Sequence, residues 1–207
     1  MKKYLVLALA CAFTWVSNSF ATVTVSEKQI AKEVKKEIKV LKKEGWKVLP
    51  GSLPFERQLT DVYLKLYDRD EVGRTNFIIG SSQPVGQNID AARIQGQSLC
   101  KFDIVQQTST QLTGLIEENV ANKQLSPGDA VSISDALAKS KELISGKLGR
   151  TIPLLECYKQ LPNGNVQLMI RVAYSSEDAI NKAKEIIREQ MGEELKELGD
   201  KLDKITK

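Results

Sequence analysis

The chain has 207 residues, of which 42% are apolar and 27% are charged, a composition typical of one globular domain with appendages. It has no histidine, which excludes Ser-His-Asp triads, Cys-His dyads and zinc sites that contain histidine. The formal net charge of +4 falls by two if Lys2 and Lys3 are removed, so composition gives no reason to expect a nucleic-acid partner.

Residues 1–21 have the organisation of a secretory signal peptide. A basic start is followed by an apolar segment at residues 4–16 and by a small-x-small cleavage site that ends at Ala21. The apolar segment is shorter than a membrane-spanning helix needs. We therefore expect export to the periplasm or cell surface of a Gram-negative bacterium, with Thr22 as the mature N-terminus.

A second interpretation of the same segment is a lipobox that ends at Cys11, with lipid attached to that cysteine. The residues before Cys11 fit this motif only loosely, and residues 12–16 would remain as an apolar linker. Cleavage after Ala21 is therefore favoured. We expect membrane association only if Cys11 carries a lipid.

Residues 26–44 are predicted to form a helix, with Ser26 as N-cap and Gly45 closing it. A basic amphipathic helix can lie on an anionic membrane, but such helices usually carry bulky aromatic side chains on the apolar face. Four glutamates are interspersed with the lysines here, which favours a solvated helix docked by one narrow apolar seam. The seam is Ile30, Val34, Ile38 and Leu41, and the glutamates are Glu27, Glu33, Glu37 and Glu44.

Residues 46–49 are predicted to form a short strand that precedes a proline-glycine turn. We expect Trp46 to be a core or rim residue. A helix then starts at Ser52 and Pro54. The inward positions of this helix are Leu59, Val62, Tyr63 and Leu66. Residues 75–81 follow as a buried strand of β-branched and aromatic type.

A long helical pattern begins at Asn88, which we expect to be its N-cap, and Ala92 and Gly96 make one of its faces small enough to lie close against a sheet. Ser126 and Pro127 start a return helix, antiparallel to the first. The predicted inward residues of the first helix are Ile89, Ala92, Gly96, Leu99, Phe102, Val105, Leu112, Ile116 and Val120. Those of the second are Ile133, Leu137, Ile144 and Leu148.

Residues 151–161 and 165–174 flank Pro162-Asn163-Gly164, and Asn-Gly is a strong hairpin signal because both residues tolerate positive φ. Apolar residues alternate strictly in the second strand, so we expect one of its faces to be core. They are Val166, Leu168, Ile170 and Val172. Ser175 or Ser176 then caps a last helix that steps through Ile180, Ala183, Ile187, Met191, Leu195, Leu198, Leu202 and Ile205.

The stretch "FIIGSSQPVGQ" combines strand, glycine turn and helix start, the order found in phosphate-binding loops. Gly80 and Gly86 are too widely spaced for a dinucleotide fingerprint, and Pro84 removes a backbone donor. Ser98 and Lys101 match the S-x-x-K pattern of serine acyltransferases, but its companion motifs are missing and Ser98 lies inside a helix.

The acidic residues Glu117, Glu118, Asp129 and Glu156 show no sign of forming a buried, opposed pair, and the two glutamates at 117 and 118 are expected to face water. We therefore name no catalytic, cofactor-binding or metal-binding residue. Cys100 and Cys157 leave two interpretations open. In an exported chain they could pair, whereas their apolar surroundings suit free buried cysteines.

The stretches "IIGSSQPVGQNIDAARIQGQ" and "IPLLECYKQLPNGNVQLMIRVAYSSEDA" resemble the domain of small bacterial envelope lipoproteins. The N-terminal domain of a flagellar ring assembly protein has a similar plan. The resemblance covers residues 75–184 and lies in glycine and alanine spacing. Because most members of that family have no known active site, it implies an envelope location and a non-catalytic role, and it transfers no functional residue.

Together these patterns predict an α+β fold: a small antiparallel or mixed sheet with a long helix pair on one face, plus N- and C-terminal amphipathic helices. The expected divisions are a signal peptide at 1–21, a helical segment with a short strand at 22–74, the lipoprotein-like domain at 75–184 and a helical tail at 185–207.

The expected function is a non-catalytic envelope protein that binds a partner or helps an assembly. The alternative is a hydrolase of envelope polymers, working through two carboxylates or through Ser98 and Lys101. The expected partner is another envelope protein or a second copy. We also expect the N-terminal seam to pack with the seam of Met191, Leu195, Leu198 and Leu202, either within one chain or, as a coiled coil, between two chains.

Overall fold

A computed structural model describes residues 25–191, so the signal segment and most of the C-terminal seam lie outside the described residues. Within that part the chain has the α+β fold that the sequence predicts. The helices are α1 (Glu27–Lys43), α2 (Phe55–Leu66), α3 (Ile89–Ala121), α4 (Pro127–Lys147) and α5 (Ser176–Met191). The strands are β1 (Lys47–Val48), β2 (Phe77–Ser82), β3 (Val85–Gly86), β4 (Ile152–Gln160) and β5 (Val166–Ser175).

The strands form one antiparallel sheet in the order β1-β4-β5-β2, with β3 also pairing with β5. The hairpin of β4 and β5 is confirmed, but its turn differs from the predicted type. An Asn-Gly turn of the predicted kind has a positive φ at both Asn163 and Gly164, but here only Gly164 has one, of 83°. The backbone N–H of Gly164 donates to the carbonyl of Leu161, which closes a turn around Pro162 and Asn163.

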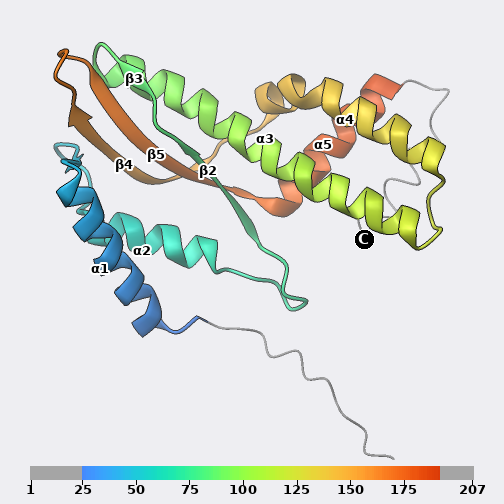
Figure 1. Cartoon of the computed structure of the whole chain (residues 1–207), viewed down its shortest axis with the longest axis horizontal. Coiled ribbons are helices and arrows are strands. Elements are labelled where there is room, and N and C mark those ends of the chain that lie inside the picture. Colours follow the sequence, from blue (N-terminus) through green and yellow to red (C-terminus); the bar gives the residue numbers. More distant parts are fainter. Residues whose placement is uncertain (1–24, 192–207) are drawn as a thin grey trace, which may run out of the picture.

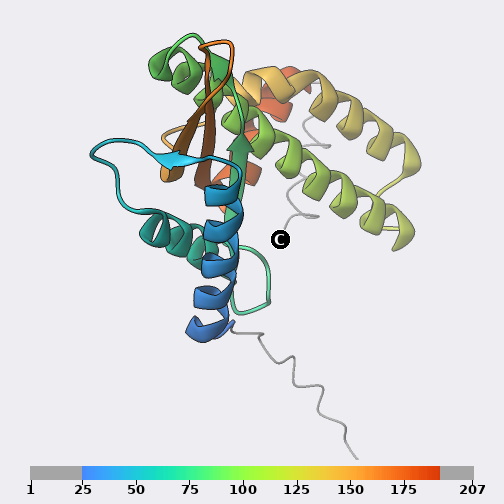
Figure 2. The same cartoon turned by 60° about the vertical axis from the view of Figure 1, so that its left-hand side comes forward.

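Helices cover both faces of the sheet (Figures 1 and 2). α3 lies on one face and α1 and α2 lie on the other. Of the predicted helix pair, α3 contacts the sheet directly, whereas α4 packs mainly against α3 and α5. β5 is therefore buried on both sides, which corrects the expectation that only its alternating face is core. Leu168 and Ile170 contribute to the cluster under α3, whereas Met169 and Ala173 contribute to the cluster under α1 and α2.

The apolar seam of α1 is filled from within the chain. Ile30, Val34 and Leu41 are buried in the same cluster as Leu59 of α2 and Leu155 of β4. The docking of α1 by one seam is thus confirmed. Among the described residues its partners are α2 and the sheet. The C-terminal seam that we expected to pack against it lies outside the described residues, so that expectation stays a prediction.

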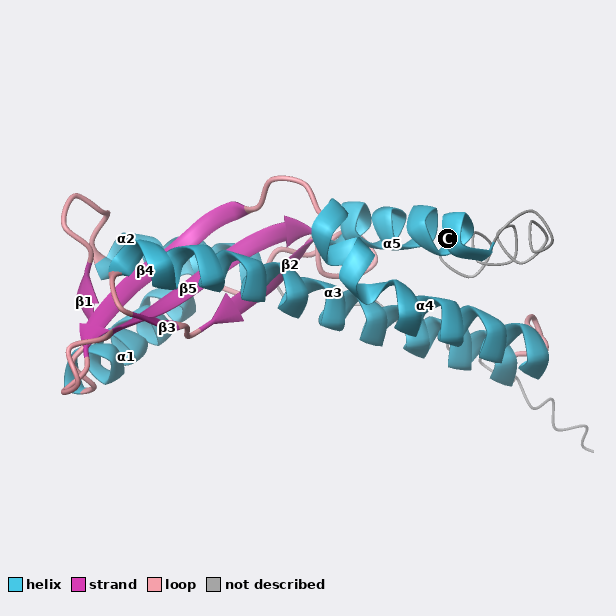
Figure 3. Cartoon of the chain, turned by 90° about the horizontal axis from the view of Figure 1, so that it is seen from above, coloured by secondary structure: helices cyan, strands magenta, loops and turns pink. Residues whose placement is uncertain are grey.

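α3 runs along the sheet and then continues past it beside α4 and α5 (Figure 3). Gly96 makes the close approach possible, because a Cβ on it would lie 2.5 Å from Cδ1 of Ile170. Leu99 and Phe102 were predicted to face inward, but they are 43% and 49% exposed. The steps from Gly96 to Leu99 and from Leu99 to Phe102 are three residues long. Three residues turn the helix by about 300°, about 60° less than a full turn, so both side chains lie away from the buried stripe.

Local capping residues explain where the helices begin. The side chains of Ser26, Asn88 and Ser126 each accept a hydrogen bond from a backbone N–H three residues further on, as predicted. α2 instead begins after Pro54 without a side-chain cap, and Leu66 at its end is exposed rather than inward. None of the helices in residues 25–191 has an apolar stretch sufficient to cross a membrane.

Candidate functional site

A cleft of about 1080 Å³ lies where the sheet ends and α3 continues. Three segments line it: the loop that leads into β2, the middle of α3, and the start of α5 together with the last residue of β5. The polar side chains that line it include Arg74, Asn76, Gln111, Glu118, Ser176 and Asn181.

The loop that precedes β2 is held in shape by Asp70. One oxygen of this carboxylate accepts hydrogen bonds from the backbone N–H groups of Val72, at 3.0 Å, and Arg74, at 2.7 Å. The turn also needs Gly73, whose φ is 85°. Asp70 is therefore occupied in organising one wall of the cleft, which leaves it poorly placed to act as an acid or base on a ligand.

Two consecutive serines mark the point where β5 becomes α5. The hydroxyl of Ser175 accepts from the backbone N–H of Asp178 at 3.1 Å, so Ser175 is the cap of α5. The backbone N–H of Ser176 donates to the carbonyl of Asn76 at 3.0 Å, which ties the two walls together. The residue Ser176 is 8% exposed, and its hydroxyl has no hydrogen-bond partner.

A buried hydroxyl without a partner costs about 1–3 kcal/mol of folding free energy. Ser176 is among the residues that line the cleft, although its hydroxyl oxygen is itself buried. Gln111 and Asn181 add amide donors and acceptors, and charged side chains of both signs stand on the rim, Arg74 and Glu118 among them. The arrangement suits a polar ligand rich in hydrogen-bonding groups rather than a strongly charged one.

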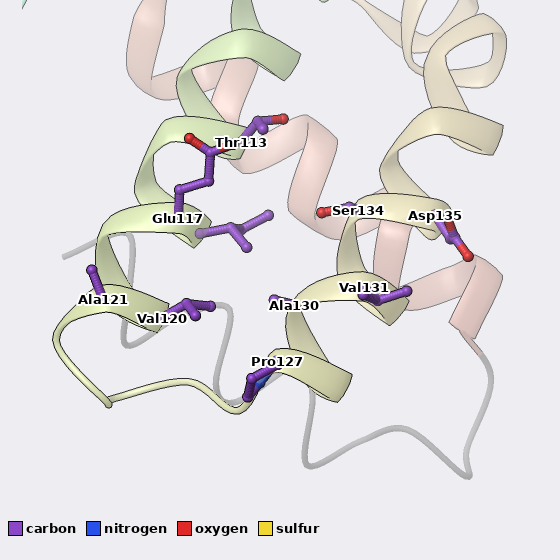
Figure 4. A pocket seen from close by; sticks show the side chains of 10 residues that line it. Thr113, Glu117, Val120, Ala121, Pro127, Ala130, Val131, Ser134 and Asp135 are labelled. Carbon is purple, nitrogen blue, oxygen red and sulfur yellow. The ribbon is translucent and has the colours of Figure 1, made fainter.

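A second, more apolar hollow of about 560 Å³ lies between the end of α3 and the start of α4 (Figure 4). Val120 lines it from α3, Ala130 and Val131 line it from α4, and Pro127 stands where the loop enters α4. Glu117 stands on its rim and is exposed, as the sequence predicted for that residue.

The residues weighed as catalytic candidates are engaged elsewhere. The hydroxyl of Ser98 donates to the carbonyl of Ile94 in its own helix at 3.3 Å, and Nζ of Lys101 donates to the carbonyl of Leu148 at 3.1 Å. Neither Ser98 nor Lys101 lines the large cleft, and neither does Glu156. The carboxylate of Glu156 instead forms a 2.6 Å ion pair with Arg93 of α3. Of the acidic residues that the sequence singled out, the cleft contains Glu118.

A polar cluster that the sequence did not indicate joins α1, α2 and β5. Arg171 forms a 2.6 Å ion pair with Glu37, and their side chains are only 24% and 17% exposed. The other oxygen of Glu37 accepts from the hydroxyl of Tyr63 at 2.9 Å. Burial and this carboxylate raise the pKa of Tyr63 to about 12. The cluster fixes α1 against the sheet, and because Glu37 and Arg171 are far apart in the chain, no local pattern could have revealed it.

Cys100 and Cys157 are both free and buried, so the structure has no disulfide between them. Cys100 packs in the cluster under α3 and Cys157 in the cluster under α1 and α2, on opposite faces of the sheet. Burial raises the pKa of both thiols, that of Cys157 to about 12. They behave as small apolar side chains of the core.

Within residues 25–191, no group of three or more cysteine or acidic side chains could hold a metal ion. A scan against protein-family models, a search of curated proteins and a search of solved structures each found no significant match. The resemblance to small envelope lipoproteins therefore stays a prediction from the sequence.

Proposed function

We propose that the chain is exported and works in the cell envelope as a non-catalytic binding or assembly protein. The observation that carries this proposal is the large cleft between α3 and α5, which the side chains of Gln111 and Asn181 help to line. A site that holds a ligand by hydrogen bonds needs such groups in place beforehand. The signal-like segment at residues 1–21 supports export.

The ligand class that fits the cleft is a polar, largely uncharged chain, such as a glycan or a peptide main chain of a partner protein. Gln111 and Asn181 offer amide groups to such a ligand, and Phe77, Leu115 and Ile180 offer apolar contacts beside them. Self-association remains a second proposal for the partner. Because the seam of α1 is already buried, self-association through a terminal helix would have to use the C-terminal seam.

Gly114 offers a way to fill the cleft without disturbing the fold. It lines the cleft on α3, and no atom lies within 4 Å of a Cβ built on it. Gly146 on α4 is a matched control, because it is equally open and lies outside the cleft. Both positions are exposed and helical, so Gly114→Trp and Gly146→Trp make the same change in the same kind of structure.

Affinity capture from the native envelope, with protein and glycan both identified, tests the proposal. We expect the wild type and Gly146→Trp to retain the same ligand and Gly114→Trp to lose it. The competing proposal is a hydrolase, for which the cleft offers the rim carboxylates of Glu118 and Glu177. Turnover of peptidoglycan fragments that disappears in Glu118→Gln, Glu177→Gln or Ser98→Ala, with the fold intact, would establish that alternative instead.

A further inference from the structure

α1 carries a continuous basic face on the outside of the molecule. Seven lysines are all exposed, and at about 100° per residue they fall within an arc of about 120° that runs about 22 Å along the helix. They are Lys28, Lys32, Lys35, Lys36, Lys39, Lys42 and Lys43, and we call this set the lysine face. Figure 2 shows α1 on the surface, with one side turned away from the sheet.

The acidic residues of α1 do not neutralise this face. They are interspersed with the lysines in sequence, but the helical turn places all four outside the arc of the lysine face. Glu37 is committed to Arg171 and Tyr63, and Glu44 accepts from the indole N–H of Trp46. In the part of the chain that the structure describes, none of the seven lysines has an ion-pair partner.

This geometry overturns the reason for expecting α1 to be merely solvated. The interspersed glutamates were that reason, and they lie on another side of the helix. The absence of bulky aromatic residues still argues against insertion of α1 into a bilayer. It does not argue against electrostatic adhesion, which needs only clustered positive charge near an anionic surface and is worth about a factor of five in affinity for each lysine.

We propose that the lysine face binds the surface of a membrane that contains anionic phospholipid, with α1 lying flat and no part of it inserted. The residue types favour this occupant over a protein. Lysine is depleted in protein interfaces, where arginine and aromatic side chains are enriched, and α1 has neither of these. The same lack disfavours nucleic acid, whose bases are recognised by arginine, asparagine and aromatic side chains.

The shape of the lysine face agrees with a planar target. α1 is a regular 17-residue helix whose buried side packs against α2 and the sheet. The lysines therefore project from one side of a helix whose position is fixed. A shallow hollow of about 650 Å³ runs along the lysine face, but every residue that lines it belongs to α1, so no second element encloses it around a small anion. This site is separate from the cleft, because no residue of α1 lines that cleft. A variant of the lysine face therefore leaves the lining of the cleft unchanged.

The test compares two triple variants of the full chain, each purified in the form that the cell produces. Lys32→Gln with Lys35→Gln and Lys39→Gln removes three charges from the lysine face. The matched control removes three exposed charges elsewhere, through Lys123→Gln, Lys139→Gln and Arg150→Gln. Glutamine keeps a good helix propensity, and circular dichroism checks that both variants are folded.

Sedimentation with vesicles of phosphatidylcholine, with and without phosphatidylglycerol, measures the binding. We expect wild type and control to prefer the anionic vesicles, and the lysine-face variant to bind them about 100-fold more weakly. About 1 M salt, where the Debye length is about 3 Å, should abolish the preference. Equal loss in both variants would overturn the proposal, as would no preference for anionic vesicles. Tighter binding to a DNA duplex or to polyglutamate at the same salt would overturn it as well.

Discussion

Replacing Gly80 by alanine tests how closely β2 approaches α3. A Cβ on Gly80 would lie 2.4 Å from the carbonyl oxygen of Cys100 and 2.8 Å from Cγ1 of Ile104. The first of these is a helix backbone atom that cannot rotate away, so the strand or the helix must shift. Overpacking of this kind costs about 1–3 kcal/mol. Alanine recovers only about 0.5–1 kcal/mol of strand stability relative to glycine.

We therefore expect Gly80→Ala to lower the free energy of unfolding by about 1 kcal/mol and the Tm by about 2–4 °C. Gly114→Ala is the control, since its added methyl group meets no atom and should stabilise the helix by about 1 kcal/mol. Urea unfolding followed by circular dichroism, with the slope compared between variants, measures both changes. If Gly80→Ala is as stable as the wild type, β2 and α3 do not pack as described and the reasoning fails.

Three further predictions concern titration, thiol reactivity and processing. The pKa of Tyr63 is raised in the folded state to about 12 from a usual value near 10, so stability should fall as pH rises from about 10 to 12. Glu37→Gln should move that pKa back towards 10, which absorbance titration of the phenol can follow. Cys157, with its raised pKa, should resist alkylation in the native protein and react on unfolding. Mass spectrometry of the native protein should find Thr22 at the N-terminus, and a lipid on Cys11 would contradict this.

Features governed by short stretches of sequence could be predicted. Ser26, Asn88 and Ser126 cap their helices because a side-chain oxygen needs only a backbone N–H three residues away. Gly164 indicated the hairpin because a tight turn needs a residue with positive φ, and glycine adopts that conformation readily. The antiparallel sheet with α3 on one face followed from these elements and their apolar stripes.

Features that depend on distant segments could not be predicted. The cleft exists because three segments, around Arg74, Gln111 and Ser176, meet at the end of the sheet, and none of them carries a local motif. The sequence suggested that glutamates intersperse the lysines of α1, but residues that alternate along the chain can lie on different sides of a helix. Leu99 was predicted to face inward but is exposed, because an apolar side chain alone does not show which side of α3 is covered by other elements.

The position of β5 in the chain has a consequence for biosynthesis. β5 supplies side chains to both hydrophobic clusters, yet it is the last strand in the sequence. The helices α1–α4 therefore leave the ribosome before the strand that both helical layers need for burial of their apolar stripes. Neither cluster can be completed until Ser175 has been synthesised. For a chain that crosses a membrane unfolded, as we propose for this one, late completion would keep the precursor competent for translocation.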